Sequence, residues 1–193
     1  MLVIDSAVFS DIAGIILVQT ENLLMNKDKL NTTQKEFYSS KGFLIHSFTG
    51  DDLEKIIEDQ KNHILLVGSE NNEVVGYFLG YNLGEWMKYK PDWIHKAFIN
   101  LKLKNVLQEN KILYGRHVAR KPLYRGKQIG RKLEHAAFQE SKKQEYQNII
   151  VEILERPIPN EVSIKVHASL GYVKIGTMLE GDNLEWGIWK KDL

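Results

Sequence analysis

The sequence predicts a mixed α/β fold, in which a central, mostly antiparallel sheet of six to seven strands is flanked by helices. Two β-rich runs, 63–68 and 73–81, are separated by Ser-Glu-Asn-Asn and predict a hairpin. A strand ending near Ala119 is followed by apolar residues at helical spacing. A last hairpin, 173–178 and 185–190, is predicted around a Gly-Asp-Asn turn.

Composition limits the classes of function. The chain has 193 residues, enough for one sizeable core, and we expect 1–193 to be a single domain. It is 43% hydrophobic and 26% charged with a formal net charge of +1, which gives no reason to expect nucleic acid or an anionic membrane as the main partner. The absence of cysteine excludes a disulfide framework and a cysteine nucleophile. The apolar run 12–18 is far shorter than the roughly 20 residues of a membrane span, so we expect a cytoplasmic protein.

The first 60 residues predict a short strand over 1–5 and a helix over 10–25, capped by Ser10 or Asp11. The residues expected to face inward from this helix are Phe9, Ile12, Ile16 and Leu23. The polar stretch that follows predicts short helices around 32–39 and 51–59.

The segment 81–110 is too long for a simple connector and mixes aromatic residues with lysines. Long loops in compact domains are often functional, so one interpretation is a lid over a substrate pocket. The other is an amphipathic helix over 91–103 whose aromatic residues merely pack. Aromatic residues interleaved with lysines also occur in proteins that bind single-stranded nucleic acid, but this chain has no basic surplus.

The segment 118–131 reads V-A-R-K-P-L-Y-R-G-K-Q-I-G-R and leads from a strand into a helix that opens near Gln128. The apolar face of this helix carries Ile129, Leu133, Ala136 and Ala137. Two glycines lie among three cations just before and within its first turn. Unpaired N–H groups and the positive end of the helix dipole make such a start a seat for a phosphate or pyrophosphate. The alternative is an ordinary basic strand–turn–helix.

Residues 125–130, R-G-K-Q-I-G, resemble the acyl-CoA signature of the GNAT superfamily of N-acetyltransferases, usually met as P-x-Y-R-G-K-G-I-G. Gln128 departs from this pattern, because the family normally has glycine there, and its side chain can crowd the pyrophosphate. A predicted strand over 147–154, then 157–163 and 167–172, look like the second half of the family, P-x-N-x-x-S-x-x-x-H-x-x-L-G-F/Y. The resemblance is strong over 112–172 and implies a GNAT-like fold with a splayed sheet.

The resemblance implies transfer of the acetyl group of acetyl-CoA to a primary amine of a small molecule or peptide, by direct attack without a covalent intermediate. Backbone N–H groups of the splayed strand would hold the pantetheine arm and the developing oxyanion, and those of the loop the pyrophosphate. The implied cofactor-binding residues are Val118, Ala119, Arg120, Arg125, Gly126, Lys127, Gln128, Ile129, Gly130, Arg131, Asn160 and Ser163. Asn160 is equally suited to cap the last helix. A homodimer is a family-level expectation, and a weakly active module that binds CoA or a protein partner is the alternative function.

His167 stands four residues before Gly171, where many members of the family carry the tyrosine that protonates the departing thiolate. An imidazolium can act as this general acid, and the alternative is a hydrogen-bonded, inert histidine. The general base is Glu152 or His117, although Glu152 is equally suited to a structural role. The remaining histidines have no spacing that marks a metal site, and we predict none.

Overall fold

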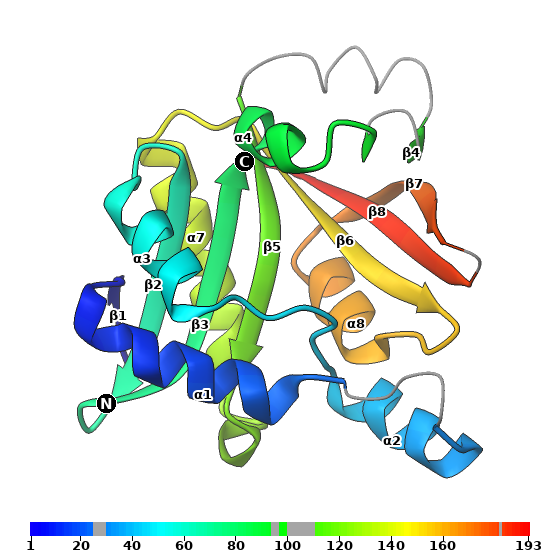
Figure 1. The fold of residues 1–193 in the computed structure, drawn as a ribbon, viewed down its shortest axis with the longest axis horizontal. Helices are drawn as coiled ribbons and strands as arrows, with labels where there is room; N and C mark the ends of the chain where they lie inside the picture. Colours follow the sequence, from blue (N-terminus) through cyan, green and yellow to red (C-terminus); the bar gives the residue numbers. More distant parts are fainter. Residues whose placement is uncertain (25–29, 94–96, 100–110, 182) are drawn as a thin grey trace.

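The computed structural model describes residues 1–24, 30–93, 97–99, 111–181 and 183–193, which form one twisted sheet with helices on both faces (Figure 1). The sheet has eight strands in the order β1-β2-β3-β5-β6-β8-β7-β4, and all neighbouring pairs are antiparallel except β5 and β6. The strands are β1 Val3–Ser6, β2 His63–Glu70, β3 Glu73–Asn82, β4 Ala97–Ile99, β5 Ile112–Arg120, β6 Asn148–Arg156, β7 Val173–Glu180 and β8 Leu184–Asp192. The predicted fold class is confirmed, and the three-residue β4 is the strand beyond the expected seven.

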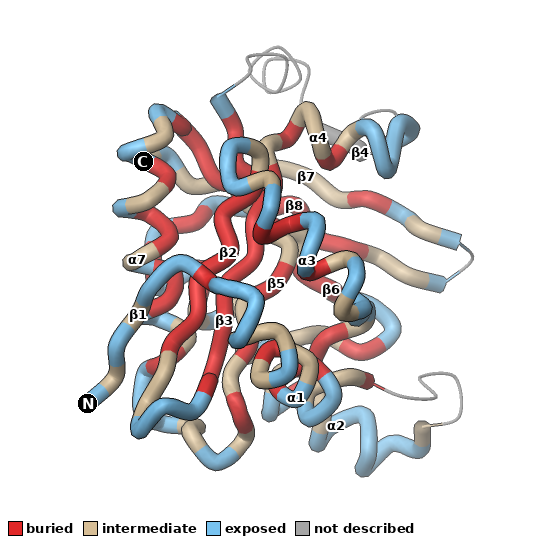
Figure 2. Tube along the Cα trace, turned by 60° about the vertical axis from the view of Figure 1, so that its left-hand side comes forward, coloured by how far each residue is buried: buried red, intermediate tan, exposed pale blue. Residues whose placement is uncertain are grey.

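The helices divide the core into two parts, one on each face of the sheet. They are α1 Ile12–Asn22, α2 Thr32–Lys41, α3 Gly50–Glu58, α4 Leu83–Tyr89, α7 Ile129–Lys143 and α8 Glu161–Ser169, with 3-10 turns η1 Phe9–Asp11 and η3 Pro122–Tyr124. Side chains of α1, α3 and α4 pack on one face and those of α7 on the other, with Leu170 and Tyr172 after α8. The buried residues follow the central strands between these helices (Figure 2).

The sheet opens between β5 and β6. These strands pair in parallel only over Ile112–Gly115 and Asn148–Val151. Beyond that point β5 continues along β3 to Arg120, while β6 continues along β8, so the two strands part (Figure 1). A register shift opposite Gly80 leaves Arg116 as an extra, bulged residue at the point of parting.

Several local expectations are corrected. The first helix ends at Asn22, since Leu23 is extended and forms a β-bridge with Leu44. Phe9 is 55% exposed rather than inward-facing, because it lies in η1 and is out of phase with the helix. Within 91–103, Ala97–Ile99 form a strand, so one continuous helix over that range is wrong. The rest of that range beyond Trp93 lies outside the described residues.

The hairpin between β2 and β3 turns on Asn71 and Asn72 alone. Both have positive φ, 53° and 62°, as the tight turns that suit the twist of paired strands require. Both strands therefore extend further than the sequence predicted. Within the described residues, no helix is long and apolar enough to cross a membrane.

Candidate active site

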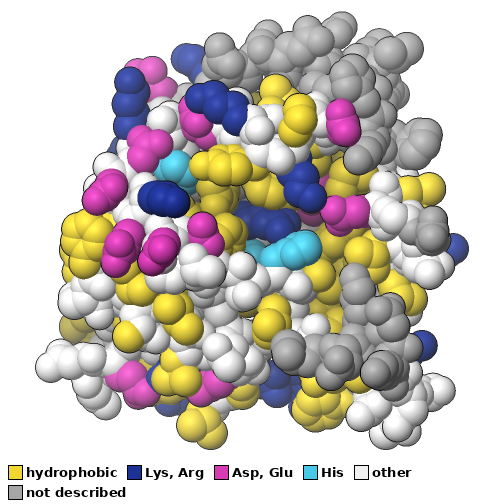
Figure 3. Space-filling view, viewed as in Figure 1, with side chains coloured by type: hydrophobic (Ala, Val, Ile, Leu, Met, Phe, Trp, Pro, Cys, Tyr) yellow, Lys and Arg dark blue, Asp and Glu magenta, His cyan; other side chains and the backbone are white. Residues whose placement is uncertain are grey.

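A cavity of about 340 Å³, which we call the β5–β6 cleft, occupies the gap where the two strands part. Its walls come from β5, the loop before α7, β6 and α8, and from Asn22 and residues 41–45 across the opening. In the space-filling view, charged and histidine side chains gather in a hollow near the middle of this face (Figure 3). The parting of β5 and β6 thus produces a cavity, which is lined by residues of both motifs, 125–130 and 157–172.

The phosphate seat is a backbone feature of the loop that leads into α7. Gly126 and Gln128 have positive φ, 81° and 59°, and the helix begins at Ile129. The N–H groups at the start of such a helix have no intrahelical partner. A Cβ atom added at Gly126 or Gly130 would meet nothing within 4 Å, so both backbones are open to a ligand. Gly126, Gln128, Gly130 and Arg131 line the cleft.

Two residues of this segment, Lys127 and Ile129, do not line the cleft. Ile129 is 3% exposed and belongs to the core beneath α7. The Lys127 ammonium lies 4.4 Å from the centre of the Tyr124 ring and 3.8 Å from a Glu70 oxygen. Arg131 does line the cleft, and its guanidinium donates to the Ser169 hydroxyl at 2.6 Å. Ile129 can therefore serve an anion here through its backbone N–H group, whereas the Lys127 N–H already donates to the Tyr124 carbonyl oxygen at 3.3 Å.

One wall of the cleft is formed by β5 and the segments packed against its end. Val118, Ala119 and Arg120, which the resemblance implied as cofactor-binding residues, line the cleft. The Asn22 amide donates to the carbonyl oxygens of Val18 and Arg120, at 2.8 and 2.9 Å, and so fixes the last residue of the strand. Asn22 was not predicted from the sequence, because only the tertiary fold brings the end of α1 to β5.

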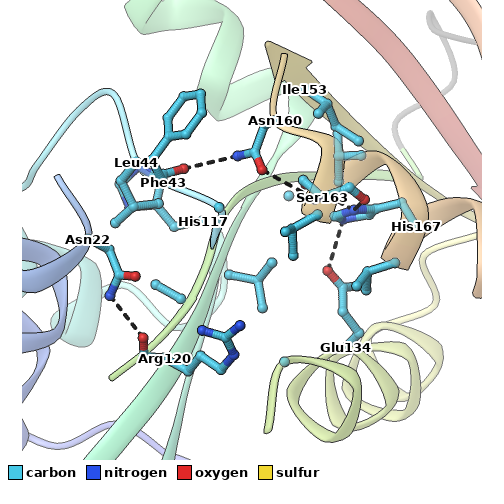
Figure 4. A pocket seen from close by; sticks show the side chains of 18 of the residues that line it. Asn22, Phe43, Leu44, His117, Arg120, Glu134, Ile153, Asn160, Ser163 and His167 are labelled. Carbon is cyan, nitrogen blue, oxygen red and sulfur yellow. Dashed lines mark hydrogen bonds and ion pairs between the residues drawn. The ribbon is translucent and has the colours of Figure 1, made fainter. Parts of the chain in front are cut away.

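Asn160 joins the two sides of the opening. Its carbonyl oxygen accepts from the Ser163 N–H at 3.2 Å, which confirms its predicted role as the cap of α8. Its amide donates to the Phe43 carbonyl oxygen at 3.1 Å (Figure 4). The segment after α2 is thereby tied to the start of α8 across the cleft.

His167 lies on the cleft wall in a buried hydrogen-bond network (Figure 4). Its Nδ1 is 2.8 Å from the Ser163 carbonyl oxygen, and its Nε2 is 3.2 Å from Glu134 Oε1. The Tyr172 hydroxyl donates to the other Glu134 oxygen at 3.0 Å. A carbonyl only accepts hydrogen bonds, so Nδ1 carries a proton, and Nε2 stands at ion-pair distance from Glu134. Burial alone lowers the pKa of His167, but the hydrogen bond and charge of Glu134, with the Ser163 carbonyl, outweigh it and raise the pKa above 6.5.

Glu152 stands on β6 just beyond the last residue paired with β5. Its carboxylate accepts hydrogen bonds from the Trp93 indole N–H and, at 2.6 Å, from the Tyr114 hydroxyl. Burial raises the pKa of Glu152 above 4.5 despite these hydrogen bonds and the nearby Arg116 charge. It lines both the β5–β6 cleft and a second pocket of about 220 Å³, so it stands where the two cavities adjoin.

His117 also lines the cleft, but it is 6% exposed and its Nδ1 is 2.8 Å from the Tyr77 hydroxyl. Burial, with the charges of Arg116 and His46, holds its pKa well below 6.5, so the ring is neutral at pH 7. Of the two predicted bases, Glu152 lines both cavities, whereas His117 lines the β5–β6 cleft but not the second pocket. Among the described residues, no cluster of three or more His, Asp or Glu side chains has the geometry to hold a metal.

A profile of the acetyltransferase (GNAT) family matches residues 28–172, well over half of the chain. This match covers the loop before α7, the splayed strands and the α8 motif. The chain belongs to the GNAT family of acetyltransferases. No curated protein matches it at a significant level.

Solved structures with the GNAT fold resemble the chain along its whole length. An N-acetyltransferase from Staphylococcus aureus Mu50 is 18% identical, with a TM-score of 0.61 over 100% of this chain and 98% of that one. The yncA structure from Salmonella typhimurium, solved with its cofactor acetyl-CoA, is 17% identical, with a TM-score of 0.63 over 100% and 94%. The paia N-acetyltransferase from Thermoplasma acidophilum, in complex with coenzyme A, is 14% identical, with a TM-score of 0.64 over 100% and 99%. At these identities the likeness shows the GNAT fold.

The GNAT fold thus brings most of the predicted site residues around one cavity. Lining residues that the sequence did not single out include Asn22, Phe43, Leu44, Arg116 and Glu134. A weak signal existed for Glu134, a carboxylate beside the apolar stripe of α7 that turns out to be 1% exposed. The others are set by long-range packing or by the bulge in β5.

Proposed function

We propose that this GNAT protein is an acetyl-CoA-dependent N-acetyltransferase, which acetylates a primary amine of a small molecule or peptide by direct attack. The observation that carries the proposal is the course of the β5–β6 cleft. It runs from the open glycine backbone at the start of α7 to Glu152, where a second pocket begins. A phosphate-bearing thioester in the cleft and an amine in the second pocket can therefore meet at Glu152.

The cleft offers the groups that a bound thioester needs. The N–H groups of Gly126 and of 128–131 would hold the pyrophosphate at the positive end of the α7 dipole. The edge of β5 beyond Gly115, which no longer pairs with β6, offers backbone groups to the pantetheine arm and to the thioester oxygen. Preorganised donors of this kind contribute roughly 10²–10³ in rate. Acetyl-CoA supplies the activated acetyl group.

Glu152 is the proposed general base. A primary amine reaches the protein as an ammonium ion and must lose a proton before it attacks. The Glu152 carboxylate is partly buried where the two cavities meet, and its raised pKa makes it a better proton acceptor than an exposed glutamate. The base must be ionised, so activity should fall as pH drops through this raised pKa.

His167 is the proposed general acid. Its imidazole lies on the cleft wall, with Nε2 at ion-pair distance from Glu134. A proton on Nε2 can neutralise the thiolate as the C–S bond breaks. The network leaves both ring nitrogens partnered, so transfer requires the thiolate to replace Glu134 as the acceptor at Nε2.

The test is a thiol-release assay with acetyl-CoA and a panel of amines, using wild type and Glu152→Gln. The variant should lose about 10²–10⁴ in kcat/KM at neutral pH, the range of general acid–base catalysis, with acetyl-CoA affinity kept. The remaining activity of Glu152→Gln should no longer fall at acidic pH in the way that the wild-type activity does. Glu155→Gln is the matched control, since Glu155 lies on the same strand and its carboxylate pairs with Lys174 at 2.5 Å. Equal losses in both variants would refute the base assignment.

A second candidate function is a module that binds CoA or a partner with little turnover. Gln128 favours it, since this side chain lines the cleft where the family pattern has glycine. Tight acetyl-CoA binding in a calorimetric titration, with no thiol release for any amine, would support the module over the enzyme.

A further inference from the structure

The second pocket shares two charged residues with the β5–β6 cleft. It is lined by His46, Trp86, Tyr89, Lys90, Pro91, Asp92, Trp93, Arg116, Glu152, Met178 and Glu180. Two of these, Arg116 and Glu152, also line the β5–β6 cleft. The two cavities therefore meet between a cation and a carboxylate. At about 220 Å³, the pocket is smaller than the roughly 300 Å³ at which sites for drug-sized ligands begin.

Arg116 is the bulged residue of β5, and its guanidinium carbon lies 5.0 Å from the centre of the Trp86 ring. Its Nε is buried and has no hydrogen-bond partner in the described part of the chain. Among the described residues, no carboxylate oxygen lies within 4.0 Å of its nitrogens. A partly buried cation in this position is costly unless an anion pairs with it.

Two carboxylates of the pocket are already engaged by other groups. Both oxygens of Glu152 accept hydrogen bonds, one from Trp93 and one from Tyr114. Glu180 pairs with Lys90 at 3.2 Å at the exposed rim. Asp92 is also engaged within the protein. The charges of Arg116 and Glu152 act on each other, but no direct ion pair joins the Arg116 guanidinium to a carboxylate of the described residues, so its buried Nε is open to an anionic ligand.

We infer that the acceptor is a small amino acid, whose carboxylate binds Arg116 while its amino group lies at Glu152. The guanidinium fork matches a carboxylate in two hydrogen bonds, and such charge-assisted pairs are stronger than neutral ones. Trp93 and Met178 offer an apolar wall to a medium-sized side chain. This inference rests on the proposed function, and it narrows the amine to one that carries an anion.

The test compares matched acceptors that differ at the carboxylate alone. Leucine, leucinamide and isoamylamine form one series, and phenylalanine, phenylalaninamide and phenethylamine form another. A charge-assisted hydrogen bond corresponds to a factor of about 10–100. Wild type should therefore favour the free acids by about 10–100-fold in kcat/KM. Arg116→Gln should abolish this preference by slowing the acids alone, and Arg116→Lys should keep part of it.

Lys88→Gln is the control variant, because it removes one positive charge from α4 outside the pocket, where Lys88 pairs with Glu85 at 2.6 Å. It should leave the preference unchanged. Amides or amines that react as well as the acids in wild type would overturn the inference, whether or not Arg116→Gln folds, and the proposed function would stand. A loss of acetyl-CoA affinity in Arg116→Gln as large as its loss of kcat/KM for the free acids would overturn the inference too, since Arg116 would then serve the cofactor. No thiol release with any acceptor would remove the proposed function and this inference together.

Discussion

Gln128 is held in a backbone conformation that suits glycine. Its φ of 59° and ψ of 21° lie in the left-handed region, which crowds the Cβ atom of an L-residue and costs roughly 1–2 kcal/mol. The residue stands where the loop turns into α7, so the strain lies at the phosphate seat itself. The same conformation that disfavours a side chain turns the chain into α7, whose first N–H groups have no intrahelical partner.

We therefore expect Gln128→Gly to raise the free energy of unfolding by up to about 1 kcal/mol, since glycine relieves the strain but gains freedom in the unfolded chain. Acetyl-CoA affinity should be unchanged or tighter. Chemical denaturation and calorimetric titration measure the two quantities. Markedly weaker binding would show that the Gln128 side chain helps the cofactor and does not obstruct it.

The pair of His167 and Glu134 makes stability depend on pH. The pKa of His167 is raised in the folded protein, mainly by Glu134 against the opposing effect of burial, so folding favours the protonated ring. The stabilisation is fully present below about pH 6.5, the unfolded pKa. It is lost as the pH rises through the folded pKa.

Glu134→Gln should lower the free energy of unfolding by about 3–5 kcal/mol at pH 6, as expected when one partner of a buried pair is removed. The difference from wild type should shrink as the pH rises toward 9. Denaturation curves at several pH values measure this. Glu140→Gln on the same helix removes an exposed pair with Lys143 and should cost under about 1 kcal/mol. A loss in Glu134→Gln that does not vary with pH would contradict a charged pair.

At the scale of the element, β5, the loop and α7 act as one unit. The apolar side chains of α7 fix the helix on the sheet, and its first turn presents bare backbone to the cleft. Gly130 shows most clearly that the first turn of α7 is open to the cleft at a cost to the helix. It is a helical residue, for which glycine is a poor choice, yet its missing side chain leaves the cleft open.

Gly130→Ala should stabilise the protein by up to about 1 kcal/mol, because alanine is the better helix former and its methyl group meets nothing within 4 Å. The same methyl group projects toward the site proposed for the pyrophosphate and should weaken acetyl-CoA binding. Thermal unfolding and titration of one preparation measure both effects. A variant that is more stable and binds equally well would place the diphosphate elsewhere.

Elements with strong local signals were predictable, and those fixed by tertiary packing were not. The hairpins, α7 and the cap of α8 at Asn160 follow from alternation, helical spacing and capping chemistry. Phe9 was misjudged because a 3-10 turn precedes α1 and changes its phase. The strand at 97–99 was missed because its pairing with β7 is a long-range event.

At the scale of the whole molecule, the splay of the sheet organises the site. Two cores, one on each face, hold the strands apart where β5 leaves β6. The motifs indicated the phosphate loop, Glu152 and His167 from sequence. The partners that tune them, Glu134 and Arg116, lie far away in sequence or depend on a strand bulge. The homodimer and the cytoplasmic location stay predictions.

The most direct test of the central claim is a crystal structure of the protein with acetyl-CoA. The pyrophosphate should lie on the N–H groups of Gly126 and of 128–131, and the pantetheine arm should run between β5 and β6. The thioester should then end near Glu152 and His167. Cofactor bound outside the β5–β6 cleft, or lying in it with the thioester directed away from Glu152, would contradict the account.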